Sequence, residues 1–193
     1  MKRTMITSII LVLICAVSLT LFSCGTVAYW QRQGDDTKKV ETDIAEVNES
    51  AKHIVYAALD SSGDLIASGD STTAAAYAVV GYTGTPKHLV IPDSYLDAAI
   101  NAEELPVTKV LVADPYSSYK CSLNGAAYSG NDARLANNTI VTDIVFGENV
   151  VFVGAGVCAG MVNLTGVHFN HVQAGVTYTN AFLGLSITPT FAS

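Results

Sequence analysis

The stretch Ile140–Leu164, IVTDIVFGENVVFVGAGVCAGMVNL, carries the pattern from which the fold can be argued. Three triplets of apolar residues recur along the chain: Val107/Val110/Val112, Val141/Ile144/Phe146 and Leu164/Val167/Phe169. One constant interval separates the members of the last two triplets, and it lies within the range of known repeat solenoids. A short strand cannot bury such a triplet alone, whereas stacked copies build one continuous core. The sequence therefore predicts a mainly β protein with a short solenoid of a few irregular turns.

The segment from residue 146 to residue 169, FGENVVFVGAGVCAGMVNLTGVHF, has an ordered pattern. Glu148 lies at a turn after the strand, Val153 and Gly154 follow in a middle segment, and Asn163 precedes the next strand. This order resembles the BspA-like class of bacterial leucine-rich repeats, whose turns run roughly as strand, Pro-Glu-Gly, Val-Thr-x-Ile-Gly, Ala-Phe-x-Gly-Cys and Asn-Leu-x-x-Val. The resemblance implies a surface-exposed solenoid for adhesion or ligand binding, without an active site.

The resemblance covers about residues 76–188 and has departures. Residues 180–185, NAFLGL, repeat the Ala-Phe-x-Gly element, whereas residues 97–104 and 116–138 are irregular insertions. Cys158 replaces the aromatic residue that is usual in the family.

The chain is expected to divide into three parts. Residues 1–24 are a signal peptide or membrane anchor, residues 25–52 are a polar tether with a short helix, and residues 53–193 are a leucine-rich-repeat-like domain. Within that domain, residues 53–91 are expected to form an N-terminal β cap and residues 92–193 the repeats. The amphipathic helix is indicated by apolar residues at steps of four and three: Val40, Ile44, Val47, Ala51 and Ile54.

Residues 1–24 have the composition of an export signal, because Lys2 and Arg3 precede a long apolar core. Three interpretations stay open. Residues 21–24, LFSC, resemble a lipobox, in which case Cys24 would be lipidated. Residues 5–30 hold no charge and are long enough to cross a bilayer, so they could instead remain as a membrane helix. Simple cleavage is the third. All place the remaining chain outside the cytoplasm, and the first two anchor it to the bacterial cell envelope.

The charge of the chain excludes one class of partner. The formal net charge is −7, and it would become −9 after loss of Lys2 and Arg3, because residues 1–23 hold no acid. A chain this acidic lacks the basic surface that attracts phosphate backbones. We therefore expect no binding to nucleic acid.

No motif for catalysis stands out. Residues 154–159, GAGVCA, fit the Gly-x-Gly-x-x-Ala fingerprint of dinucleotide sites, but residues 149–193 contain no acid to hold the ribose. His168 and His171 are three apart, so on a strand they would point to opposite faces and could not share a metal. We expect no catalytic residue, cofactor or metal, and hence no enzyme.

The cysteines do not form a disulfide framework. Cys15 lies in the apolar segment, and Cys24 is the candidate for lipidation. Cys158 occupies a position where the repeat needs a buried apolar residue, a role that a free cysteine fills well. A bridge between Cys121 and Cys158 stays possible outside the cytoplasm.

These features favour one function and leave a second open. The first is a membrane-tethered leucine-rich-repeat protein that binds a protein or glycan partner at the cell surface. The alternative is a structural envelope lipoprotein that only associates with itself. If the apolar triplets point inward, the residues between them line the opposite face of the sheet. We expect a partner-binding strip on that face, comprising Thr108, Lys109, Leu111, Thr142, Asp143, Val145, Thr165 and His168.

The C-terminal segment predicts a further contact. At the same interval after the third triplet, the next one is Ile187/Thr190/Ala192, a degraded strand in a segment without acidic or basic residues. An open last turn tends to pair with another chain. We expect an end-to-end contact of this turn with a second copy or with another envelope protein.

Overall fold

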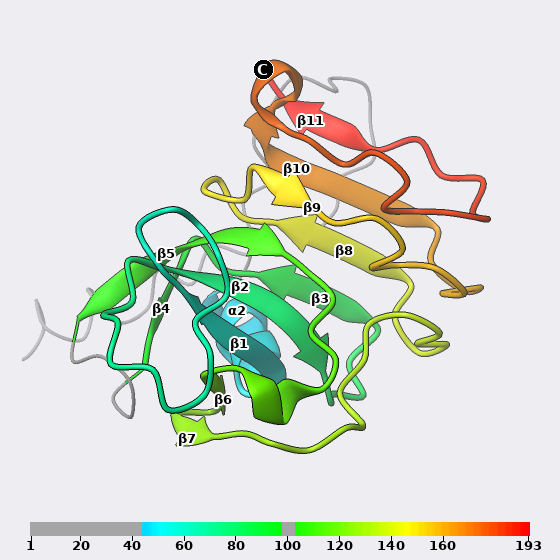
Figure 1. The fold of residues 1–193 in the computed structure, drawn as a ribbon. Coiled ribbons are helices and arrows are strands. Elements are labelled where there is room, and N and C mark those ends of the chain that lie inside the picture. Colours follow the sequence, from blue (N-terminus) through cyan, green and yellow to red (C-terminus); the bar gives the residue numbers. More distant parts are fainter. Residues whose placement is uncertain (1–43, 98–102) are drawn as a thin grey trace, which may run out of the picture.

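A computed structural model describes residues 44–97 and 103–193, which form a mainly β fold with one α-helix, α2 (Ile44–Ala51) (Figure 1). The strands divide between a curled mixed sheet and a separate parallel sheet. The mixed sheet has the order β4-β5-β2-β1-β6-β7, with β9 paired to β5. Its strands are β1 (Ile54–Leu59), β2 (Ala76–Tyr82), β4 (Ser94–Leu96), β5 (Glu104–Val110), β6 (Cys121–Leu123), β7 (Ala126–Ala127) and β9 (Phe152–Val153).

The parallel sheet has the order β11-β10-β8-β3. Its strands are β3 (His88–Ile91), β8 (Asp143–Phe146), β10 (Gly166–Val172) and β11 (Thr190–Ala192). Two short 3-10 helices, Tyr116–Ser118 and Gln173–Gly175, lie in the connections.

β1 is buried along its whole length because both of its faces are covered. Ile54, Tyr56 and Ala58 belong to the larger hydrophobic core, and the alternate residues belong to the smaller one. A strand covered on both faces has an apolar sequence without polar alternation, as IVYAAL does. β1 is therefore an interior strand that separates two cores.

The parallel sheet holds its apolar residues in register. Ile144 of β8 pairs with Val167 of β10, and Phe146 pairs with Phe169. On the other side of β8, Leu89 and Ile91 of β3 pair with Ile144 and Phe146. These rows contribute to the larger core.

The prediction of a leucine-rich-repeat solenoid is wrong. In a solenoid each turn stacks on the next one along the chain, but residues 92–142 lie between the neighbouring strands β3 and β8. The triplet at residues 107–112 does not join the parallel sheet, because β5 pairs with β2 and β9 of the mixed sheet. Val112 is 59% exposed.

The expected N-terminal cap and the expected last turn are also corrected. Residues 53–91 supply the central strands β1 and β2 of the mixed sheet and the edge strand β3 of the parallel sheet, so they do not cap a stack. In the last turn, Phe191 rather than Thr190 or Ala192 pairs with Phe169. The constant interval would have placed Ala192 opposite Phe169, so the observed register is shifted by one position.

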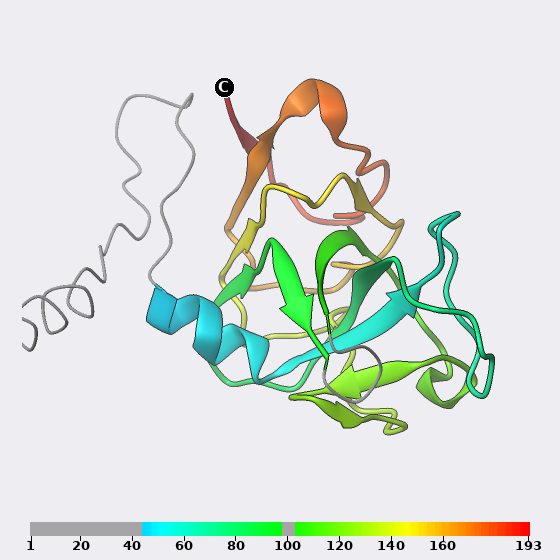
Figure 2. The same cartoon turned by 90° about the vertical axis from the view of Figure 1, so that its left-hand side faces the viewer.

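Helix α2 covers the edge of the parallel sheet at β3, as Figure 2 shows. The buried hydroxyl of Ser50 accepts a hydrogen bond of 3.0 Å from the backbone N–H of Val90. The expected short helix is thus present over Ile44–Ala51. The expected signal or anchor, Cys24 and the first part of the tether lie outside the described residues. Within residues 44–97 and 103–193, no helix is long and apolar enough to cross a membrane.

Candidate functional site

The residues of the expected binding strip do not form one strip. Thr108, Lys109 and Leu111 lie in or just after β5, in the mixed sheet. The others lie in or just before β8 and β10 of the parallel sheet: Thr142, Asp143, Val145, Thr165 and His168. The prediction of a single strip required β5 to lie beside β8, but these two strands belong to different sheets and do not pair.

Several of these residues make contacts within the fold. Val145 and His168 of the expected strip are only 1% and 4% exposed. Asp143 lies 3.2 Å from His88 of the neighbouring strand and accepts a hydrogen bond from Thr142. The ammonium of Lys109 donates a hydrogen bond to the carbonyl oxygen of Gly63. The structure therefore gives these side chains partners inside the protein.

Cys121 and Cys158 are both free and buried. Burial away from water raises the pKa of each thiol to about 12, because the thiolate is the form that burial disfavours. No group of three or more histidine, cysteine, aspartate or glutamate side chains in the described part of the chain is placed to hold a metal ion.

A polar cavity lies at the end of β2, against the loop of residues 131–140. Its volume is about 360 Å³. Most of its lining side chains are amides, hydroxyls or charged groups, and the lining comprises Tyr82, Thr83, Gly84, Asn131, Asp132, Arg134, Ala136, Asn137, Asn138, Thr139 and Ile140. Small ligands bind in concave sites, where a few polar groups fix their orientation. We take this cavity as the candidate functional site.

The loop is held against β2 by backbone contacts. The N–H of Tyr82 donates a hydrogen bond of 2.6 Å to the carbonyl oxygen of Ala133. Gly81 permits this approach, because a Cβ atom at this position would collide with the same carbonyl group. Ala133 and Leu135 are buried and anchor the loop in the two cores.

The far end of the loop has its own supports. The side-chain oxygen of Asn138 accepts hydrogen bonds from the N–H groups of Ile140 and Val141, at 2.8 and 3.1 Å. The amide of Asn163 donates a bond of 2.6 Å to the carbonyl oxygen of Thr139. Asn137 has a φ of 64°, a left-handed conformation that asparagine tolerates better than most residues. These contacts hold the loop of residues 131–140 in place, and the loop forms one side of the cavity.

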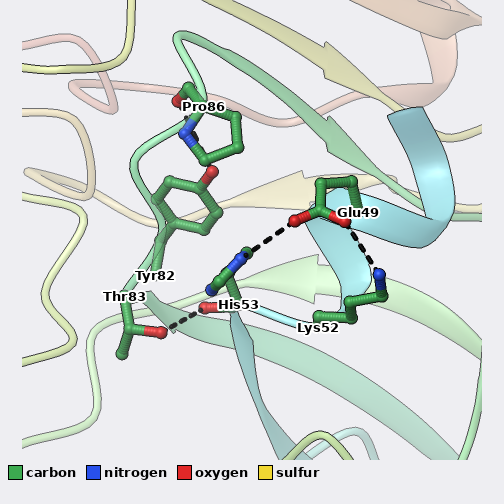
Figure 3. Close-up of polar contacts among 6 residues, drawn as sticks. All are labelled: Glu49, Lys52, His53, Tyr82, Thr83 and Pro86. Atoms are coloured by element: carbon green, nitrogen blue, oxygen red, sulfur yellow. Dashed lines mark hydrogen bonds and ion pairs between the residues drawn. The ribbon is translucent and has the colours of Figure 1, made fainter. Parts of the chain in front are cut away.

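Tyr82 and Thr83 also line the cavity, and contacts through His53 connect them to helix α2, as Figure 3 shows. The hydroxyl of Thr83 donates a hydrogen bond to the carbonyl oxygen of His53, and the ring of His53 lies 3.3 Å from a carboxylate oxygen of Glu49. The ring of Tyr82 packs edge-on against the same histidine, with centroids 6.3 Å apart. Tyr82 and Thr83 are thus positioned from the helix side as well as from β2.

The charges at the cavity are balanced locally. The guanidinium of Arg134 forms an ion pair of 2.6 Å with Asp114. The hydroxyl of Tyr128 donates a hydrogen bond of 2.6 Å to Asp132, and this bond lowers the pKa of that carboxyl group. Both groups retain further donors or acceptors. The cavity therefore offers directional polar groups and little net charge.

The sequence did not point to this site, because residues 116–138 have the pattern of an irregular insertion. The run Asn131-Asp132 followed by Asn137-Asn138-Thr139 was a usable signal, since it concentrates amide side chains in one short loop. The partner wall at residues 82–84 comes much earlier in the chain, and no local pattern connects the two.

The resemblance to BspA-like repeats stays a prediction from sequence motifs. Compared with known proteins, the chain matches no protein-family model, no curated protein and no solved structure.

Proposed function

We propose that this chain is a tethered binding module, and that its cavity holds an uncharged polyhydroxy ligand such as a segment of a cell-surface glycan. The observation that carries this proposal is that Asn131, Asp132, Arg134 and Asn137 all line one cavity. A sugar hydroxyl both donates and accepts a hydrogen bond, and a side-chain amide beside a carboxylate and a guanidinium supplies both partners.

Two physical arguments favour a neutral ligand. The chain has a net charge of −7, which repels anions at long range, and Arg134 is already paired with Asp114.

A cavity of about 360 Å³ suits a few sugar units. A protein partner would need a contact area of roughly 800 Å² on each side.

The location outside the cytoplasm rests on the sequence of residues 1–24. In this proposal Cys24 is lipidated and residues 25–43 connect the membrane to the folded domain. Labelling cells with a radioactive fatty acid tests the anchor, and Cys24→Ala should remove the label and leave the precursor uncleaved. An unlabelled wild-type protein would contradict lipidation.

The ligand is tested with the full chain in detergent micelles. Neutral hexose and N-acetylhexosamine tetrasaccharides are titrated by calorimetry, with sulfated tetrasaccharides for comparison. We expect binding of a neutral probe. Asn131→Ala and Asn137→Gly should each weaken that binding about tenfold, the cost of one or two lost hydrogen bonds.

Asn180→Gly is the matched control for Asn137→Gly. Asn180 is also exposed and also has a left-handed backbone, with a φ of 58°, but it lies outside the cavity. Its replacement by glycine should leave the affinity unchanged. The proposal fails if no neutral saccharide binds, or if Asn180→Gly weakens binding as much as Asn137→Gly does.

A further inference from the structure

The two edges of the parallel sheet differ. At one edge, helix α2 covers β3, and Ser50 accepts the hydrogen bond of a backbone N–H of that strand. At the other edge lies β11, the last strand in the order (Figure 1). Among the described residues no strand pairs with the outer side of β11. Natural proteins usually protect such an edge with a short strand, charges, proline or a covering element, and of these β11 has its short length and the preceding Pro189 but no charge.

An aromatic row leads to this open edge. Phe146, Phe169 and Phe191 lie on three successive strands and stack in order, with centroids 4.4 and 5.1 Å apart. Phe146 and Phe169 are fully buried, whereas Phe191 is half-buried. Tyr178 packs at an angle against both Phe169 and Phe191, and among the described residues no further ring is stacked parallel to Phe191. A further strand beside β11 would extend the row.

The distribution of charge along the chain favours a second copy as the partner of this edge. Residues 149–193 hold no Asp, Glu, Lys or Arg, so all 17 acids and 10 bases of the chain lie before them. Four of the large apolar side chains most exposed to solvent also lie in this segment: Val151, Val162, Val172 and Leu183. Two copies of a protein with net charge −7 repel each other elsewhere, but not where these uncharged segments meet.

We infer that β11 pairs antiparallel with β11 of a second copy about a two-fold axis, joining the two parallel sheets into one. An edge strand related to itself by a two-fold axis is self-complementary, because the same backbone donors and acceptors meet from both sides. The contact buries the half-exposed Phe191 of each copy. It involves neither the cavity nor its ligand, so it stands apart from the proposed function.

Sedimentation of the full chain in density-matched detergent micelles tests this contact. The wild-type protein should be a dimer, and Ala192→Lys should raise its dissociation constant at least about tenfold, because each copy would bring an ammonium group into an uncharged contact. Val162→Lys is the matched control, since it adds the same charge to the same segment at a side chain that is 71% exposed. It should leave the dimer intact.

A second measurement does not depend on the stability of these variants. In membranes, oxidation should join two copies of Ala192→Cys through residue 192, identified from the linked peptide, and should not join copies of Leu183→Cys through residue 183. A wild-type protein that stays monomeric at high micromolar concentration would overturn the inference. Equal dissociation by Ala192→Lys and Val162→Lys would overturn it as well.

Discussion

The ring of Phe169 stacks on the ring of Phe146, with centroids 4.4 Å apart and planes inclined by 14°. The two residues face each other on β10 and β8, and both are fully buried. Both rings belong to the larger core. The same relationship repeats between Phe169 and Phe191, where the outer ring is half-buried.

The stacked row of phenylalanines predicts that Phe169→Ala and Phe191→Ala lower the free energy of unfolding by different amounts. Phe169→Ala should lower the free energy of unfolding by about 3–5 kcal/mol, because it removes a buried ring and leaves a cavity between two others. Phe191→Ala should cost less in the monomer, since its ring is already partly exposed there. Urea denaturation at constant protein concentration measures both values. Equal costs would show that Phe191 is as buried in solution as Phe169.

Gly81 should control the cavity from outside it. Gly81→Ala introduces a Cβ atom that collides with the carbonyl group of Ala133, so the loop of residues 131–140 must move away from β2. We expect a loss of stability of about 1–3 kcal/mol and a loss of ligand affinity. Denaturation and calorimetry measure the two effects.

Gly154→Ala is the control for this substitution. A Cβ atom at Gly154 would come no closer than 3.4 Å to another heavy atom, so alanine fits there. It should leave affinity unchanged. If Gly81→Ala binds the ligand as well as Gly154→Ala does, the loop does not need its contact with β2.

The docking of helix α2 on β3 should depend on the hydroxyl group of Ser50. Ser50→Ala leaves the buried N–H of Val90 without its acceptor, at a cost of about 1–3 kcal/mol in the free energy of unfolding. Ser62→Ala, at an exposed turn, is the matched control and should change stability little. Thermal unfolding followed by circular dichroism compares the variants. Similar losses at both positions would argue against this docking contact.

Stability should fall at alkaline pH. Burial raises the pKa of Tyr82 and of Tyr116 from about 10 to about 12, and it raises the pKa of Tyr56 and Tyr77 as well. The folded state thus holds these protons more tightly than the unfolded chain. Their contribution to stability is complete below pH 10 and is lost as the pH rises toward 12.

Denaturation measured across this pH range tests the effect. Tyr116→Phe removes one titrating group, and the slope of stability against pH should become shallower between pH 10 and 12. This variant also loses the hydrogen bond from Tyr116 to the carbonyl oxygen of Val80, so only the slope is diagnostic. An unchanged slope would mean that Tyr116 ionises as readily in the folded protein as in the unfolded one.

Local spacing predicted part of the parallel sheet. The constant interval that separates Ile144 from Val167 indicated that their strands lie side by side, and the two residues do pair. The apolar pattern within residues 107–112 was misleading, because β5 lies in the other sheet. Burying a short apolar strand removes about the same apolar area from water in either sheet, so the apolar pattern does not predict which strand it pairs with.

By itself, the sequence indicated the strands β8 and β10 and their apolar residues, because apolar spacing is a property of the local chain. It also determined that residues 149–193 carry no Asp, Glu, Lys or Arg. Only the tertiary structure decided that β3 neighbours β8, and that Tyr82 meets Ala133 at the wall of a cavity. These pairings join residues that are far apart in the sequence, and they depend on how all the strands together bury their apolar faces and satisfy their backbone hydrogen bonds.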